Sequence, residues 1–162
     1  MRNRWITALS LFLLVLCGCT VSFSPQPQAD LPEPTAGSPP QQAEAEAAAR
    51  EYLSMIDSAA YDETWERSGS ALRDTTNRFV WTNMLKATSR SLGIDADRQV
   101  DGFGFTTQPD AGVPVGEYVL VQFKSKSGNA TATEKVVMQR EQGAWKIVGY
   151  FITKRAVFGT ET

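Results

Sequence analysis

One stretch decides the fold: Glu134-Lys-Val-Val-Met-Gln-Arg-Glu-Gln-Gly-Ala-Trp-Lys-Ile-Val-Gly-Tyr-Phe-Ile152 contains two β-rich runs around a Gly-containing turn. Side chains alternate along a strand, so the second run would carry Trp145, Ile147 and Phe151 on one face and Val148, Tyr150 and Ile152 on the other. A strand that is apolar on both faces is expected inside a sheet. Gly149 interrupts the first face, which predicts a bend in the sheet or the close approach of another backbone.

The residues before this stretch follow the same two-residue period from position 99 onward. The candidate strands are Gln99–Thr107, Glu117–Lys126, Thr131–Arg140 and Ala144–Thr153. Turn-forming residues separate them at Pro109–Gly116, Ser127–Asn129 and Glu141–Gly143. Connections this short join antiparallel neighbours. Gly102-Phe-Gly104 is a fragment of a dinucleotide signature with no helix after it, and we interpret it as a bulge or a close packing site.

Helical spacing covers the chain between the prolines and the first strand. A first helix is expected over Gln41–Ser58, with Ala45, Ala49, Tyr52 and Ile56 on its apolar face. A short second helix should lie within Ala59–Ser68, and a third should be capped near Asp74 or Thr75 and run to Leu92. The apolar stripe of the third helix would be Trp81, Leu85, Thr88 and Leu92, with Phe79 and Met84 beside it. We expect Trp145 to pack against this stripe near Trp81 and Leu85.

Helices followed by strands predict an α+β fold, in which N-terminal helices pack on a curved four-stranded antiparallel sheet. At 162 residues the chain is expected to form one core. Residues 41–158 would form this single α+β domain, and residues 159–162 a short tail.

The N-terminus has the pattern of an export signal. Arg2 and Arg4 precede an apolar run from Ile6 to Leu16, too short for a comfortable membrane span. Leu16-Cys17-Gly18-Cys19 follows and resembles the bacterial lipobox. That resemblance implies a lipoprotein signal peptide over residues 1–18, cleavage before Cys19, and acylation of Cys19 as a membrane anchor. The alternative is an ordinary cleaved signal with two incidental cysteines.

Residues 19–40 are predicted to be a disordered, Pro-rich tether after the lipidated cysteine. They hold Pro25, Pro27, Pro32, Pro34, Pro39 and Pro40, and few apolar residues. Such a composition favours extended polyproline II conformations. By resemblance to bacterial lipoprotein sorting, Thr20 after the acceptor cysteine implies the outer membrane, with the domain facing the periplasm.

Composition excludes several classes of function. The chain has no histidine, so catalytic triads and His-ligated zinc sites are excluded. Removal of the leader deletes two arginines and no acids, which leaves 14 bases against 18 acids and a net charge of −4. This balance disfavours a nucleic-acid binder. No cysteine follows Cys19, and the aspartates lack the spacing of a calcium loop. We therefore predict no metal, no cofactor and no catalytic residue.

The domain also resembles a known bacterial family, and the resemblance covers roughly residues 43–154. It is carried by Tyr61, Trp65, Trp81, Arg90-Ser-Leu-Gly93, Gly116-Glu-Tyr118, Glu134 and the ending Gly143-Ala-Trp-Lys-Ile-Val-Gly-Tyr-Phe-Ile152. This is the family of domain of unknown function 4019, whose members are typically short exported proteins without assigned activity. Helices before a curved sheet also resemble the cystatin-like and nuclear-transport-factor-like architecture, often a cone whose mouth holds a ligand or partner.

Four residues are candidates for a surface or pocket role: Arg90, Asp101, Glu134 and Tyr150. A carboxylate or phenol in an apolar cavity could act as an acid or base. The alternative is solvation on edge strands for the two acids, a hydrogen-bonded core phenol for Tyr150, and a structural ion pair between Arg90 and Glu134. We expect a non-enzymatic module that binds an envelope protein or component through its sheet. The alternative is a small-molecule binder or His-free enzyme that uses the cone mouth.

Overall fold

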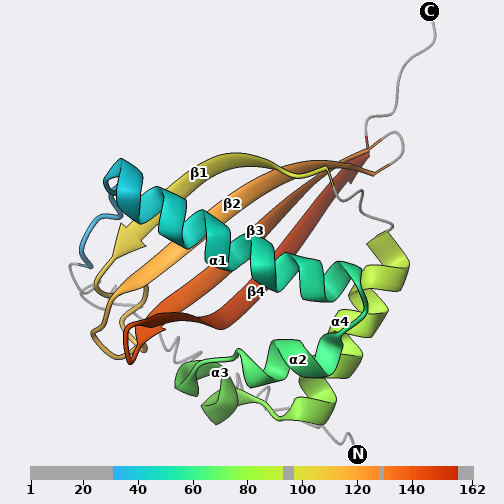
Figure 1. Ribbon diagram of the computed structural model, residues 1–162, viewed down its shortest axis with the longest axis horizontal. Helices are drawn as coiled ribbons and strands as arrows, with labels where there is room; N and C mark the ends of the chain where they lie inside the picture. The colour runs from blue at the N-terminus through green and yellow to red at the C-terminus, as the bar shows by residue number, and fades with distance from the viewer. Residues whose placement is uncertain (1–30, 93–96, 128–129, 157–162) are drawn as a thin grey trace, which may run out of the picture.

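A computed structural model describes residues 31–92, 97–127 and 130–156. In these residues four helices precede four strands: α1 (Pro39–Asp57), α2 (Tyr61–Glu66), α3 (Ser70–Thr75), α4 (Arg78–Leu92), β1 (Gln99–Thr106), β2 (Tyr118–Ser127), β3 (Ala130–Glu141) and β4 (Ala144–Ala156). In Figure 1, α1 crosses one face of the sheet, and the other three helices gather beside β4. The export signal, Cys19, Gly93, Asp95 and the C-terminal tail lie outside the described residues.

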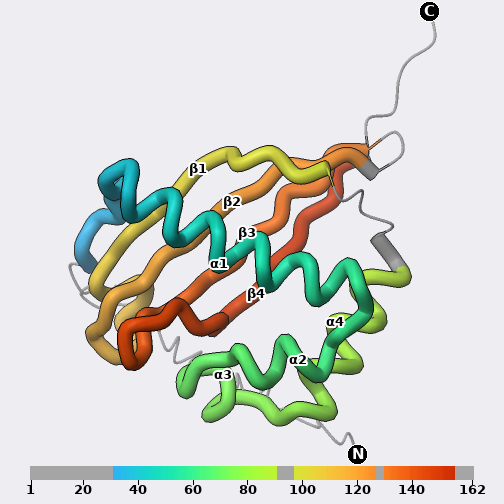
Figure 2. Tube along the Cα trace, in the orientation of Figure 1, coloured from blue at the N-terminus to red at the C-terminus, as the bar shows by residue number. Residues whose placement is uncertain are grey.

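The strands form a single antiparallel meander in the order β1-β2-β3-β4, as the sequence predicts. The hairpin between β3 and β4 turns through Gln142 and Gly143, whose φ angles are 52° and 80°. Two successive residues with positive φ are typical of the type I′ turn, whose backbone twist matches the twist of the two strands that it joins. Together with the helices on one face, this sheet confirms the α+β class, and Figure 2 follows the meander along the chain.

The first helix begins two residues earlier than expected, at Pro39. Proline is tolerated in the first helical turn because the backbone N–H it lacks would have no partner there. Gln41 Oε1 accepts hydrogen bonds from the backbone N–H and the hydroxyl of Ser38, both at 2.8 Å. Its expected apolar face is confirmed, since Ala45, Ala49, Tyr52 and Ile56 are all buried.

The predicted third helix corresponds to α4, whereas α3 was not expected, and the expected cap at Asp74 or Thr75 is wrong. Thr76 adopts an extended conformation and ends α3. Asn77 then accepts a hydrogen bond from the backbone N–H of Val80 at 3.0 Å and caps α4. Trp81 and Leu85 are buried as expected, but Phe79 is 76% exposed and Met84 42% exposed. These two side chains therefore face solvent and do not extend the core.

The last strand is an edge strand, whereas its two apolar faces predicted an interior position. Its free edge is covered by the turn after α2, where Ile147 N–H donates to Arg67 O and Gly69 N–H to Ile147 O. The opposite edge is covered by residues before α1: Thr35 and Phe105 exchange two backbone hydrogen bonds of 2.8 Å. Both edges of the sheet are thus partly paired, which limits association through them.

A bulge in β4 changes which side chains face the core. Val137 pairs with Gly149 but Met138 pairs with Ile147, so one extra residue lies in β4 at this point. A bulge bends its strand, so the register shift beside Gly149 fits the first of the two expectations for that residue, a bend, and not the close approach of another backbone. It also means that the expected faces are wrong, because Tyr150 joins Ile147 on the helix side and Phe151 turns outward, 60% exposed.

Trp145 lies at the opposite end of the core from α4, so its expected packing on Trp81 and Leu85 is wrong. Its ring centroid is 6.3 Å from that of Phe105, and the guanidinium of Arg140 lies 4.2 Å from the ring. Trp81 instead donates a hydrogen bond from its indole nitrogen to Thr64 at 3.0 Å. The two tryptophans therefore support separate parts of the core.

Candidate functional site

Glu134 is a fully buried carboxylate on the helix-facing side of the sheet. It lies on the same face of β3 as Ala132, Val136 and Met138, which are also buried. Its Oε1 accepts hydrogen bonds from Arg98 Nε at 2.8 Å and from Ser125 Oγ at 3.2 Å. Its Oε2 accepts one from the Tyr150 hydroxyl at 2.7 Å. Both oxygens are occupied by protein donors, so the carboxylate is already hydrogen bonded and held in one orientation.

Arg98 connects this carboxylate to the end of α1. Its guanidinium holds Asp57 through two hydrogen bonds, of 2.6 Å and 2.9 Å, and its side chain is only 5% exposed. Burial alone lowers the pKa of Arg98, but the hydrogen bonds and charges of Asp57 and Glu134 outweigh burial and raise it. We call Arg98, Ser125, Glu134 and Tyr150 the buried cluster, and the exposed Asp57 connects it to α1.

Tyr150 serves the buried cluster as a hydrogen-bond donor. Burial raises its pKa well above the ordinary value for tyrosine, and the negative charge of Glu134 raises it further. The phenol therefore stays protonated at neutral pH and is poorly suited to act as a base. The buried cluster ties α1, the segment before β1, and three strands together, which is a structural role.

The four sequence candidates fall in three different places. Glu134 and Tyr150 meet in the buried cluster, where the interpretation of Tyr150 as a hydrogen-bonded core phenol fits. The interpretation of Glu134 as a solvated edge residue is wrong, because β3 is an interior strand and the side chain is 0% exposed. The expected ion pair between Arg90 and Glu134 is also wrong, since Arg90 is exposed on α4 and the ionic partner is Arg98.

Asp101 lies on the outer side of β1 and is exposed. It accepts hydrogen bonds from Lys124 Nζ at 2.7 Å and Gln122 Nε2 at 2.5 Å, and these donors lower its pKa.

Two residues that contribute to this site, Asp57 and Arg98, were not among the candidates from the sequence. The inward position of Glu134 between apolar residues was a signal that a buried cation would be needed, but it did not identify which one.

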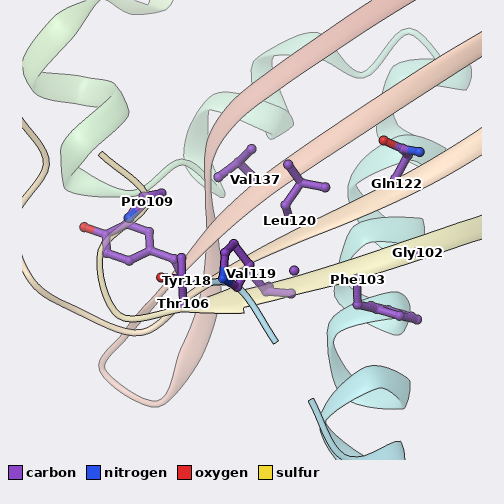
Figure 3. Close-up of a pocket in the computed structure, with 11 residues that line it drawn as sticks. Gly102, Phe103, Thr106, Pro109, Tyr118, Val119, Leu120, Gln122 and Val137 are labelled. Carbon is purple, nitrogen blue, oxygen red and sulfur yellow. The ribbon is translucent and has the colours of Figure 1, made fainter. Parts of the chain in front are cut away.

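A second feature is a groove of about 410 Å³ on the sheet face opposite the helices. Its walls come from β1, β2, β3, the loop before β2 and the segment before α1: Pro34, Gly102, Phe103, Gly104, Thr106, Pro109, Tyr118, Val119, Leu120, Gln122 and Val137. Figure 3 shows Leu120 and Val137 next to one another on neighbouring strands. We call this feature the outer groove.

Glycines on both sides of two apolar residues shape the outer groove. The register aligns Gly104, Leu120, Val137 and Gly149 in one row across the four strands. Because β1 and β4 present no side chain in this row, Leu120 and Val137 are only partly covered. At one end the groove is closed by Tyr118, which is 1% exposed. Its hydroxyl donates a hydrogen bond to Pro114 O at 2.9 Å.

Two kinds of site are absent from the part of the chain that the structure describes. Within the described ranges no three Asp, Glu, His or Cys side chains gather as metal ligands would. No helix among the described residues combines the length and apolar character that crossing a bilayer requires.

Comparison with known proteins places the chain in a family but gives no activity. No curated protein matches the chain. The model of one family matches residues 48–150, more than half of the chain. The chain therefore belongs to the family described as protein of unknown function (DUF4019).

Proposed function

We propose that this protein is a lipid-anchored envelope lipoprotein, held at the outer membrane and facing the periplasm, whose domain is a non-enzymatic binding module. The anchor would be Cys19, within the lipobox-like Leu16-Cys17-Gly18-Cys19. The domain would bind an envelope component through the outer groove and the sheet face around it. The tether would be shorter than residues 19–40, because Thr35 pairs with Phe105 and α1 begins at Pro39. Residues 19–30 would then separate the anchor from the domain, by at most about 37 Å as polyproline II.

The outer groove is the main observation that supports this proposal. It is concave, mostly apolar and lies on a sheet face without a described helix, which are features of a binding surface. Phe151, 60% exposed, lies beside it in the next row, opposite Lys135. Exposed aromatic residues next to an apolar groove are common anchors of interfaces.

The alternative, a His-free enzyme or small-molecule binder at the mouth of a cone, would use Glu134 or Tyr150. Neither residue lines the outer groove, and Glu134 is 0% exposed with both oxygens hydrogen bonded. A substrate would have to displace Arg98 before it reached the carboxylate. We therefore favour binding without catalysis.

Site-specific photo-crosslinking in intact cells tests the surface. A photoreactive phenylalanine analogue at Phe151 should form adducts with an envelope component. The same analogue at Phe79, which is also aromatic and is more exposed but is located on α4, should form few adducts. Charge reversal of the neighbouring Lys135 should reduce the Phe151 adducts. Adducts from Phe79 with none from Phe151 would show that binding uses the helical side instead.

Acyl labelling and membrane fractionation test the anchor separately. Cys19→Ala should abolish incorporation of labelled fatty acid and release the protein from the membrane fraction. Cys17→Ala is the matched control and should leave both unchanged. If Cys17→Ala alone released the protein, the assigned cleavage site would be wrong.

A further inference from the structure

The basic residues of the sheet gather on the face that carries the outer groove. Strand alternation and cross-strand register place five of them there: Lys124, Lys126, Lys135, Lys146 and Arg155. Lys124 ion-pairs with Asp101, and no described carboxylate ion-pairs with the other four. The whole chain has a net charge of −2, so this face is more positively charged than the chain as a whole. It would attract an anionic ligand.

The outer groove is apolar along its length and cationic at one end. From Tyr118 to Gln122 it follows β2 for roughly 13 Å. Gln122 pairs across the strands with Lys135, and Lys124 is the next outward residue on β2. The opposite end is closed by Tyr118 and Pro109 (Figure 3). A ligand that enters from the open end would therefore place its apolar part inside and its charged part beside the lysines.

We propose that the outer groove binds an amphiphilic anion with a single acyl chain, the chain lying over Leu120 and Val137 and the anionic head between Lys124 and Lys135. This inference rests on the proposed function and names its ligand class. A single chain is favoured because the groove follows one strand, β2, with Gly102 and Gly104 of β1 on one side and Val137 of β3 on the other. Asp101 faces the same end and pairs with Lys124, so the head would compete with Asp101 for Lys124, whereas Lys135 has no ion-pair partner among the described residues.

Photolabelling tests the ligand class on the full chain in vesicles of neutral phosphatidylcholine. The probes are dodecanoate and dodecyl phosphate that carry a diazirine on the alkyl chain. Either anionic probe should label peptides from β2 and β3, and the stronger of the two would identify a carboxylate or a phosphate head. A dodecyl trimethylammonium probe has the same chain with a cationic head and should label these peptides weakly.

Two variants act on different parts of the site. Gly102→Leu places a side chain in the groove where a Cβ meets no atom within 4 Å, so the fold should tolerate it while the acyl chain loses its place. Lys135→Glu reverses an exposed charge at the open end. Each should reduce labelling by roughly tenfold or more. Lys86→Glu makes the same charge change on α4 and should leave labelling unchanged.

Other results would overturn the inference. Equal labelling by the cationic and anionic probes, labelling unaffected by Gly102→Leu and Lys135→Glu, or labels confined to α4 would each do so. Binding that needs phosphatidylglycerol vesicles and fails with single-chain probes would identify a bilayer surface instead. If Phe151 still forms protein adducts while neither probe labels, this inference falls and the proposed function stands. If both fail, the proposed function falls too.

Discussion

The hydroxyl of Tyr150 donates a 2.7 Å hydrogen bond to the carboxylate of Glu134, and the bulge at Gly149 makes this contact possible. Without the extra residue in β4, strand alternation would turn Tyr150 to the outer face together with Val148. With it, Tyr150 pairs with Val136 and lies diagonally across from Glu134. A local irregularity in an edge strand thus completes the hydrogen bonding of a buried charge.

Removal of Arg98 should strongly destabilise the domain. Arg98→Met leaves the buried carboxylate of Glu134 without its cation, at a cost of about 3–5 kcal/mol in the free energy of unfolding. Urea denaturation measures this cost. The double variant Arg98→Met with Glu134→Met should lose much less than the sum of the two single variants, because no buried charge remains unpaired and the carboxylate of Asp57 is exposed. Additive losses would mean that the two residues are not coupled.

Stability should fall as the pH rises into the alkaline range. Burial raises the pKa of both Tyr150 and Tyr52. In the unfolded chain both phenols ionise near pH ~10, whereas in the folded state they remain protonated to higher pH. The stabilisation that each buried phenol gives to the folded state is therefore complete below pH ~10. Above that pH the free energy of unfolding falls by about 1.4 kcal/mol per pH unit for each tyrosine.

Chemical denaturation between about pH 9 and about pH 11 measures this slope. Tyr150→Phe and Tyr52→Phe should each make it shallower. Tyr150→Phe should also lower stability at neutral pH by about 1–3 kcal/mol, because one oxygen of Glu134 loses its donor. An unchanged alkaline slope in both variants would contradict the assignment.

The two core tryptophans should differ in their importance. Trp81 is 3% exposed and hydrogen bonded to Thr64, so Trp81→Ala should cost about 3–5 kcal/mol. Trp145 is half-buried, and Trp145→Ala should cost less, about 2 kcal/mol, mainly from lost contact with Phe105 and Arg140. Thermal melts of the two variants give the comparison. A larger loss for Trp145→Ala would show that the end of the core near Phe105 dominates stability.

Two glycines with positive φ allow a matched test of the segment before α1. Gly37 has φ +73°, and a Cβ there would lie 2.5 Å from the ring of Phe105. Gly143 has φ +80° and no atom within 4 Å of such a Cβ. Gly143→Ala should therefore cost only backbone strain, about 1 kcal/mol. Gly37→Ala should in addition displace residues 31–37 from β1 and speed their proteolysis. Equal proteolysis in both variants would mean that this contact is not needed to hold the segment.

The helices and strands could largely be predicted because their signals are local. Alternation and turn residues located all four strands to within a few residues, and helical spacing located the buried faces of α1 and α4. The errors arose where a local rule had two solutions. Asn77 competed with Asp74 and Thr75 as a cap, and the bulge at Gly149 reversed the expected face of Phe151.

The sequence by itself determined the four strands, their antiparallel order, the helices other than α3, the absence of histidine and the family to which the chain belongs. Only the tertiary structure decided that Arg98 pairs with both Glu134 and Asp57, because the three residues are far apart along the chain and nothing in their local patterns links them. The outer groove likewise depends on strand register, which aligns Gly104 and Gly149 with Leu120 and Val137. Local periodicity fixes the face that a side chain occupies, but long-range packing fixes its neighbours.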